Sequence, residues 1–286
     1  MSLHLNPLHA ELAVEVSGIN LRKPLGKETL AELQSALARY PVLVFHDQDL
    51  SDDEHAVFTK SFGPIDPGLA LASKRKQRLK NTDVIDLANI DADGNVLAAD
   101  NARNVSLIAN QLWHSDSSFK QPRAQYSVLC GIDLPGEGGE TEFADQRAAY
   151  DALPDTTKTR IEGLVAEHWA FHSRNMLGGG DFTPEGMAML PPVDWPIVDT
   201  IPESGRKTLF IGVHTREIRG LPTAEARMLL LDLLEHATQR EFVYRHVWRN
   251  HDVVMWDNRC TLHRGRPYDL TKLRELRRCT TEYLAA

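Results

Sequence analysis

The residue types that could carry out chemistry are concentrated in two short segments. In NQLWHSDSSF (110–119), His114 and Asp116 stand two positions apart. If this segment is extended, residues i and i+2 project from the same face, so an imidazole and a carboxylate would converge on one ion. A histidine and an aspartate at this spacing are common by chance, so the pair alone does not define a metal site.

A second segment supplies a third candidate ligand. In VVMWDNRCTLHRG (253–265), His263 follows a strongly apolar run that predicts a strand. Two imidazoles and one carboxylate form the ligand set of non-haem Fe(II) oxygenases, which leaves coordination positions open for a bidentate co-substrate and O2. Because His263 is far from Asp116 in the sequence, the two segments must meet through tertiary structure.

Arg274, eleven residues after the second histidine, could bind part of such a co-substrate. That length lets the chain turn and return on a neighbouring strand. A guanidinium binds a carboxylate through two parallel hydrogen bonds, and 2-oxoglutarate presents a distal carboxylate when its other end chelates a metal. Thr141 is a candidate hydroxyl partner, and Gly138 and Gly139 would permit close approach of the backbone there.

Together these residues resemble the taurine dioxygenase family of Fe(II)/2-oxoglutarate-dependent oxygenases. The resemblance covers nearly the whole chain. It is strongest in NQLWHSDSSF, GGETEFADQRAAYDALP, GRKTLFIGVH, LLEHATQREFVYRH and VMWDNRCTLHRGRPYD. Within the family, the sequence is most similar to the branch that oxidises aryloxyacetates such as 2,4-dichlorophenoxyacetate.

The resemblance implies a role for each residue of the metal and co-substrate sites. It implies that His114, Asp116 and His263 bind Fe(II). It also implies that Thr141 and Arg274 bind the 5-carboxylate of 2-oxoglutarate.

Further roles implied by the resemblance concern the rest of the site. Asn110 would lie near the co-substrate. Arg278 would face the anionic head of the primary substrate, and the backbone N–H of Ser117 would contact the same anion. His214 would lie near the aromatic end or the carboxylate of that substrate.

The reaction that the resemblance implies uses Fe(II), 2-oxoglutarate and O2. The co-substrate is decarboxylated to succinate and CO2, and the carbon between the ether oxygen and the carboxylate of an aryloxyacetate is hydroxylated. The hemiacetal so formed collapses to a phenol and glyoxylate. The metal and co-substrate carry the redox chemistry, and the protein supplies positioning and excludes water.

Two alternative functions stay open from the residues alone. An arginine accepts a sulfonate or sulfate as well as a carboxylate, so the enzyme could instead oxidise taurine, an alkylsulfonate or an alkylsulfate. From another class, two histidines and an aspartate could hold zinc or iron in a non-catalytic jelly-roll protein. Such a protein would have no need of Arg274 together with Thr141.

One departure from the family pattern concerns a turn. The family commonly has a glycine before the aspartate that opens the last metal-binding strand, whereas WRNHDVVMW places His251 there. A left-handed turn residue is therefore predicted at Asn250 or His251, although glycine would adopt that conformation at lower cost.

Several residues near the metal candidates are predicted to be structural. Trp113 and Phe119 flank the His114–Asp116 pair and are expected to point away from the metal into the core. Asp257 and Asn258 come before a turn and are expected to fix it.

The elements that must position these residues are mostly strands. Apolar and β-branched runs predict strands at 41–45, 83–87, 125–132, 207–213, 241–248, 252–256 and 277–283. Helix signals are fewer: leucines at helical spacing over 30–40, a capping box at Ser51 and Glu54, and possible caps at Asp145 and Thr223. Without steady strand–helix alternation, the chain is predicted to be mainly β with helical insertions, a double-stranded β-helix or jelly roll.

The whole chain, 1–286, is predicted to form a single domain. Two long stretches, near 66–82 and 172–195, are expected to be lid loops. The first contains a basic run, and the second contains three consecutive glycines and several prolines. Long loops in compact domains often cover binding sites.

Composition excludes several classes of protein. The 286 residues are 42% hydrophobic and 25% charged, which is typical of a folded globular chain. A net charge of −8 argues against a nucleic-acid binder, and no apolar run is long enough to span a membrane. Three cysteines without a C-x-x-C pattern and no visible signal sequence favour a cytoplasmic protein. The expected partner is a small anionic aromatic substrate, and the resemblance suggests a homo-oligomer, a dimer or higher.

Overall fold

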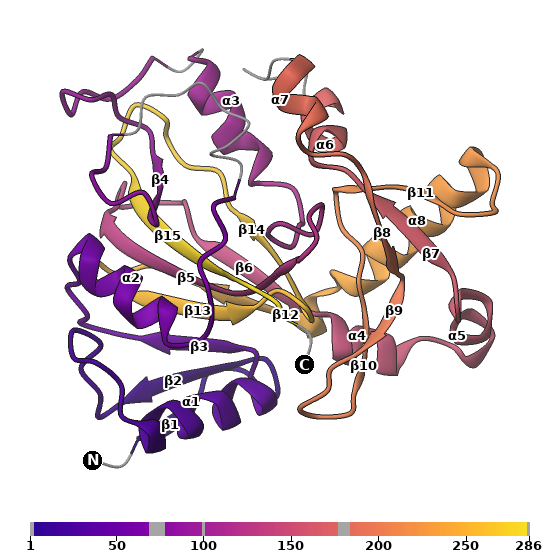
Figure 1. The fold of residues 1–286 in the computed structure, drawn as a ribbon, viewed down its shortest axis with the longest axis horizontal. Coiled ribbons are helices and arrows are strands. Elements are labelled where there is room, and N and C mark those ends of the chain that lie inside the picture. The colour runs from indigo at the N-terminus through magenta and orange to yellow at the C-terminus, as the bar shows by residue number, and fades with distance from the viewer. Residues whose placement is uncertain (1–2, 69–77, 99–100, 177–183, 285–286) are drawn as a thin grey trace.

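A computed structural model describes residues 3–68, 78–98, 101–176 and 184–284 (Figure 1). Its largest element is a seven-stranded sheet. In spatial order the strands are β1 (His4–Pro7), β2 (Ala13–Ser17), β3 (Val42–Phe45), β13 (Val253–Asp257), β5 (Ala124–Asp133), β15 (Glu275–Glu282) and β4 (Ile85–Ala88). All neighbours are antiparallel except β2 and β3. Strands from both ends of the chain therefore lie side by side.

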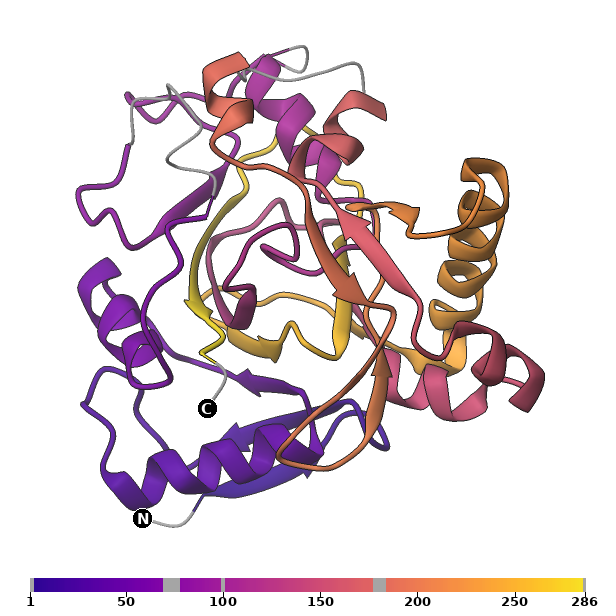
Figure 2. The same cartoon turned by 45° about the vertical axis from the view of Figure 1, so that its right-hand side comes forward.

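A second, three-stranded antiparallel sheet packs against the first. Its order is β12 (Val243–His246), β6 (Thr141–Asp145) and β14 (Thr261–Gly265). Phe143 of β6 shares one buried cluster with Leu129 of β5 and with Val254 and Trp256 of β13. The core therefore lies between two largely antiparallel sheets, as in a jelly roll, and the predicted fold class is confirmed. Figure 2 shows the arrangement of the ribbon from a second side.

The segment 253–256 shows why strand β13 lies at the centre. Val253 and Met255 pack into a cluster with residues of α1 (Lys27–Arg39) and α2 (Asp52–Lys60), which cover the outer face of the large sheet. Val254 and Trp256 point the other way, into the space between the sheets. Because successive side chains of a strand alternate between faces, a run of four apolar residues fills both.

The helix starts mostly follow their sequence signals. The capping box of Ser51 and Glu54 opens α2, and the side chain of Asp145 accepts hydrogen bonds from the first turn of α4 (Gln146–Ala152). Helix α8 (Thr223–Ala237) differs, because Pro222 is its N-cap and makes no side-chain cap. The prediction that Thr223 caps this helix is wrong, since Thr223 is the first helical residue.

A third group of elements packs beside the sheets. It comprises a three-stranded sheet and a two-stranded sheet, together with α5 (Asp155–Ile161) and α8. The strands are β7 (Val165–His168), β8 (Val193–Pro196), β11 (Thr215–Ile218), β9 (Val198–Thr200) and β10 (Lys207–Leu209). Two predicted strands are shorter than expected: β10 ends at Leu209, and β12 begins only after a 3-10 turn, Arg240–Phe242.

The two expected lid loops are described only in part. Residues 69–77 and 177–183 lie outside the described residues. In the second stretch, the end of α6 (Ala170–Met176), all of α7 (Pro184–Ala188) and the start of β8 are regular structure, so 172–195 is not loop throughout. Helix α3 (Ala102–Ala109) precedes the first metal-ligand candidates. None of the helices in the described segments combines the length and apolar composition needed to cross a membrane.

Candidate active site

The two candidate histidines are joined through their backbones. His114 donates its N–H to the carbonyl of His263 at 3.0 Å, and His263 returns the bond at 2.8 Å. The centroids of the two rings are 4.1 Å apart. This bridge brings the end of one segment onto strand β14, as the predicted metal site requires.

His114 and Asp116 reach one another without a regular strand. His114 makes only an isolated bridge, and the chain then enters a turn in which Ser117 has a φ of 44°. The expectation that the pair lies on an extended strand is therefore wrong, although the two side chains do converge. An isolated strand pattern cannot reveal this left-handed residue directly after Asp116.

The three side chains form a buried cluster. Oδ1 of Asp116 lies 3.9 Å from Nε2 of His114, and its Oδ2 lies 3.8 Å from Nε2 of His263. One ligand atom from each residue falls within 4.8 Å of the others, and all three residues are buried. These separations are too long for direct hydrogen bonds and suit three ligands around one ion.

The tautomer of His114 and the neutral state of His263 both suit metal binding. Nδ1 of His114 lies 2.7 Å from the carbonyl of Leu112, which holds the proton on Nδ1 and directs Nε2 towards Asp116. Burial lowers the pKa of His263 well below its usual value, with His114 and Arg278 adding to the effect. His263 is therefore neutral, the form in which histidine binds metals.

The carboxylate of Asp116 is oriented by a chain of hydrogen bonds. The Ser127 hydroxyl donates to its Oδ2 at 2.7 Å, and the Asn258 amide donates to that hydroxyl at 2.9 Å. Oδ1 of Asn258 also accepts from the backbone N–H of Asp116 at 3.1 Å. Ser127 and Asn258 were not predicted to act here; Asn258 was assigned only to a turn. The sequence signal for the role of Asn258 was the polar pair Asp257–Asn258, which directly follows the apolar run of β13.

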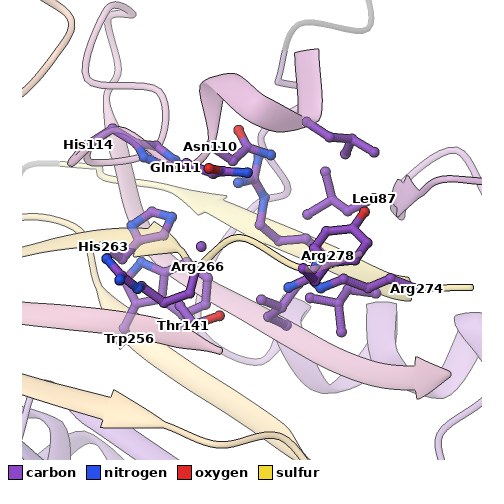
Figure 3. A pocket seen from close by; sticks show the side chains of 15 residues that line it. Leu87, Asn110, Gln111, His114, Thr141, Trp256, His263, Arg266, Arg274 and Arg278 are labelled. Carbon is purple, nitrogen blue, oxygen red and sulfur yellow. The ribbon is translucent and has the colours of Figure 1, made fainter. Parts of the chain in front are cut away.

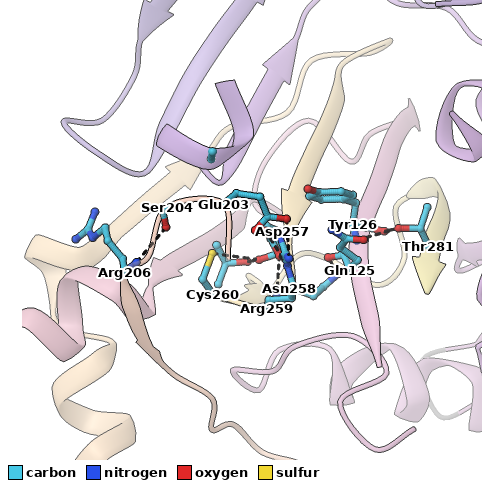
Figure 4. A network of polar contacts seen from close by, with 12 residues as sticks. Gln125, Tyr126, Glu203, Ser204, Arg206, Asp257, Asn258, Arg259, Cys260 and Thr281 are labelled. Carbon is cyan, nitrogen blue, oxygen red and sulfur yellow. Dashed lines mark hydrogen bonds and ion pairs between the residues drawn. The ribbon is translucent and has the colours of Figure 1, made fainter. Parts of the chain in front are cut away.

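The turn that carries Asn258 is fixed by a buried ion pair (Figure 4). Arg259 donates to Asp257 through Nε at 3.0 Å and through Nη2 at 2.7 Å, and its backbone N–H donates to the same carboxylate. Asn258 in turn bonds to the backbone of Gln125 on β5. The expectation that Asp257 and Asn258 fix this turn is confirmed, and the turn delivers β14 with His263.

A cavity lies beside the histidines, between the two sheets (Figure 3). Arg274 lines it, with Nη2 donating to the carbonyl of Gly139 at 2.9 Å. Burial lowers the pKa of Arg274 to about 10. Within the described residues Arg274 has no acidic partner, and its Nε has no hydrogen-bond acceptor. A buried cation in this state calls for an anion from outside the protein.

A comparison with Arg147 and Arg259 shows that the lack of an acidic partner at Arg274, within the described segments, is unusual. Arg147 and Arg259 are buried more completely than Arg274, but each is paired with an aspartate two residues before it, Asp145 and Asp257. Burial opposes their charge, yet the paired carboxylates raise their pKa above the usual value. Arg274 alone of the three lacks this compensation, which matches a site for a carboxylate ligand.

The remaining co-substrate candidates line the same cavity. Thr141 and Asn110 are both among its lining residues, together with Gln111, Arg266 and Tyr268. Gly139 is required beside Arg274, because it has a φ of 71° and an added Cβ would lie 2.9 Å from Nε of Arg274. The predicted group of Thr141, Arg274 and Asn110 is therefore brought together.

A second cavity also borders the cluster and contains the candidate substrate residues. It is lined by Gly68, Ala109, Asn110, His114, Asp116, Ser117, Phe119, Ser173, His214 and Arg278. Asn110, His114 and Arg278 line both cavities. Arg278 of β15 also forms an ion pair with Asp116. The metal-ligand candidates thus lie between two cavities, each with an arginine.

Several residues that line the second cavity are held in place by contacts with one another and with their neighbours. The Ser117 hydroxyl donates to Asp66, which also pairs with Lys120. Nδ1 of His214 lies 3.3 Å from the Ser173 hydroxyl, and the Phe119 ring meets the His214 ring edge-on at 4.9 Å.

The outcome differs for the two aromatic residues beside the metal pair. Trp113 packs in a cluster with Ala144 and Leu262, as expected. The expectation that Phe119 points away from the site is wrong, because Phe119 lines the second cavity. The left-handed turn at Ser117 breaks the strand spacing on which that expectation depended.

The left-handed residue predicted in the turn before β13 is His251. His251 has a φ of 67°, in the left-handed region that favours glycine. Its backbone N–H donates to the carbonyl of Gly131 at 2.8 Å, and its carbonyl accepts from Gln48 at 2.7 Å. The prediction of a left-handed residue at position 250 or 251 is confirmed, and the surrounding bonds offset the cost of the missing glycine.

Comparison with known proteins is consistent with this geometry. Residues 4–280 match the model of the family described as taurine catabolism dioxygenase TauD, TfdA family. The chain belongs to this family of dioxygenases. The family is the one that the sequence motifs resemble, and the predicted class of enzyme is confirmed.

Individual relatives are similar over almost their full length. An alpha-ketoglutarate-dependent 2,4-dichlorophenoxyacetate dioxygenase of Cupriavidus pinatubonensis is 51% identical, covering 98% of this chain and 98% of the relative. An (S)-phenoxypropionate/alpha-ketoglutarate-dioxygenase of Sphingobium herbicidovorans is 36% identical, covering 94% and 91%. The crystal structure of AAD-2 in complex with Mn(II) and N-oxalylglycine superposes with a TM-score of 0.90 at 43% identity, covering 99% and 97%.

Proposed function

We propose that this protein is an Fe(II)- and 2-oxoglutarate-dependent dioxygenase that hydroxylates the carbon between the ether oxygen and the carboxylate of an aryloxyacetate. The observation that carries the proposal is the arrangement of two cavities around one His-Asp-His cluster, with Arg274 in the first and Arg278 lining both. Two anionic reactants would meet at one metal. The resemblance to the 2,4-dichlorophenoxyacetate and phenoxypropionate enzymes supports an aryloxy acid as the substrate.

The metal would be held by His114, Asp116 and His263. Their buried ligand atoms, the neutral state of His263 and the fixed tautomer of His114 fit a divalent ion of this kind. A ferrous ion bound there would supply the activation of O2 that is coupled to decarboxylation of 2-oxoglutarate to succinate and CO2. Ser127 would hold the Asp116 carboxylate in a single orientation towards the metal.

The co-substrate would be positioned by Arg274 and Thr141. The buried guanidinium lacks an acid, so a distal carboxylate would satisfy its Nε and neutralise its charge. The Thr141 hydroxyl lines the same cavity and would donate to that carboxylate. Asn110 faces both cavities and would contact the co-substrate at its metal-binding end.

The substrate would occupy the second cavity. Arg278 and the backbone N–H of Ser117 would bind its carboxylate, and Phe119 and His214 would contact its aromatic ring. Anchoring the acid at one end and the ring at the other presents the carbon between them to the metal. Once that carbon carries a hydroxyl group, the hemiacetal breaks down to a phenol and glyoxylate without further help from the protein.

The direct test is turnover of phenoxyacetate and taurine side by side. Iron-loaded protein with 2-oxoglutarate and O2 is expected to release succinate and phenol in equal amounts from phenoxyacetate, and little succinate above background with taurine. Turnover of taurine or an alkylsulfate alone would show that the second cavity binds a sulfur oxyanion instead. Metal binding without any consumption of 2-oxoglutarate would favour the non-catalytic reading.

A further inference from the structure

Trp248 makes a directional contact with the co-substrate site. Its indole Nε1 lies 3.0 Å from Oγ1 of Thr141. An indole nitrogen can only donate, whereas a hydroxyl can donate one hydrogen bond and accept two. Thr141 is therefore the acceptor, and the proton of its hydroxyl stays available for a different partner.

The geometry points to Trp248 as the residue that sets this proton's direction; we propose that it positions Thr141 to donate to the distal carboxylate of 2-oxoglutarate. The inference rests on the proposed function, since it assigns Thr141 to that carboxylate. Thr141 lines the cavity that contains the unpaired Nε of Arg274 (Figure 3). Among the described residues, the Trp248 indole is the one recorded hydrogen-bond partner of the Thr141 hydroxyl.

Two neighbours of the indole, the His246 ring and Gly131, define its position. In the second sheet Thr141 pairs with His246, two residues before Trp248, and the rings of His246 and Trp248 meet edge-on at 4.6 Å. Gly131 of β5 leaves room for the indole, because an added Cβ would lie 3.1 Å from its Cε3. His246 is itself paired with Asp252 at 3.1 Å. The donor therefore has a fixed position relative to the hydroxyl.

Trp248 does not itself line the cavity that contains Arg274. It lines a separate outer cavity together with Leu134, Val247 and Arg249. The indole thus lies behind Thr141 as seen from the co-substrate cavity, and it can act on the co-substrate only through the hydroxyl. Trp248 is a positioning residue, and its effect must depend on the presence of the Thr141 hydroxyl.

The test is a double-mutant cycle with Trp248→Phe and Thr141→Val. Binding of 2-oxoglutarate is measured anaerobically on Fe(II)-loaded protein, and KM and kcat are measured with O2. Trp248→Phe keeps an aromatic ring without the N–H and is expected to weaken 2-oxoglutarate binding by about 3- to 10-fold, with a larger effect on KM than on kcat. In the Thr141→Val background, the same substitution is expected to have less than about a twofold effect, because the hydroxyl is gone.

A comparison of two ligands distinguishes an effect on the position of Thr141 from a general loss of folding. 2-Oxopentanoate lacks the distal carboxylate, so Trp248→Phe is expected to leave its binding unchanged while weakening that of 2-oxoglutarate. Gly131→Ala, which would displace the indole without removing it, is a second variant that should have the same selective effect.

The outcomes separate the two proposals. Equal weakening of both oxo acids, equal weakening in the Thr141→Val background, or no weakening would overturn the role of Trp248. A wild-type protein that binds neither oxo acid would instead overturn the proposed function.

Discussion

His114 and His263 exchange both backbone hydrogen bonds of an antiparallel bridge, so the distance between their rings is set by main-chain geometry. The same bridge joins the turn at Asp116 to strand β14 and thereby to the second sheet. The metal-ligand candidates thus depend on the contact between the two parts of the fold. Any change that separates the turn at Asp116 from strand β14 should abolish metal binding before it disrupts secondary structure.

Arg274→Ala tests the co-substrate site. Removing this guanidinium from a bound carboxylate should raise the KM for 2-oxoglutarate by about 30- to 5,000-fold, since such truncations cost about 2–5 kcal/mol. The measurement is the 2-oxoglutarate dependence of succinate release. Arg206→Ala, which removes an exposed ion pair with Asp151, is the control and should change this KM by less than about twofold. An unchanged KM in Arg274→Ala would exclude the assigned role.

Gly139→Ala tests the close approach of backbone to Arg274. Gly136 provides a matched control, because it also has a positive φ, 86°, but an added Cβ would meet nothing within 4 Å. Both substitutions should destabilise the fold by about 1–2 kcal/mol through backbone strain. Only Gly139→Ala should also weaken 2-oxoglutarate binding, because its Cβ would displace the guanidinium. Equal binding by the two variants would show that the contact is unimportant.

Ser127→Ala tests the orientation of the metal-binding carboxylate. Loss of the hydrogen bond to Oδ2 of Asp116 should lower affinity for Fe(II) or Mn(II) by about 10- to 100-fold. Ser115→Ala is a suitable comparison, because its equally buried hydroxyl bonds to the carbonyl of Thr261 and to no other group in the described part of the chain. Metal titration should separate the two variants. If both bind metal as the wild type does, the hydrogen-bond chain through Asn258 has no role in binding.

Two buried histidines away from the metal site predict how stability depends on pH. Burial lowers the pKa of His55 to about 4 and that of His168 to about 3. In the unfolded chain each takes up a proton near pH 6.5, whereas in the folded protein each stays neutral until about pH 3–4. The unfolded state therefore binds more protons in this window, and stability is lost as the pH falls below about 6.5.

Urea unfolding at pH 7.5 and pH 5 measures this effect. The free energy of unfolding should fall by about 1.4 kcal/mol per pH unit for each histidine below pH 6.5. His168→Gln removes one of the two groups, so its stability should depend less steeply on pH than that of the wild type. A wild type that is equally stable or more stable at pH 5 would contradict the prediction.

The sequence predicted the chemistry better than the arrangement that produces it. His114, Asp116 and His263 could be chosen because two imidazoles and a carboxylate form a known ligand set, and because the segments that carry them resemble those of one enzyme family. The turn at Ser117 could not be predicted from a local pattern, since the Ser117 hydroxyl bonds to Asp66, about 50 residues earlier in the chain. For the same reason Phe119 was assigned to the wrong side of the segment.

Residues that act through others were missed for a related reason. Ser127 and Trp248 are ordinary members of strand-like segments until the fold brings them to Asp116 and Thr141. Strand order is set in the same way, since β13 lies between β3 and β5, which are far from it in sequence. Local patterns located most of the strands of the large sheet, but they do not record which partners pair in space.

In the proposed enzyme, one ferrous ion held by His114, Asp116 and His263 would be chelated by 2-oxoglutarate anchored on Arg274. Visible absorption of Fe(II)-loaded protein under anaerobic conditions, before and after addition of 2-oxoglutarate, tests this most directly. A weak charge-transfer band is expected to form in the wild type and to be absent in His263→Ala. Protein that retains its iron and shows no band at saturating 2-oxoglutarate would contradict it.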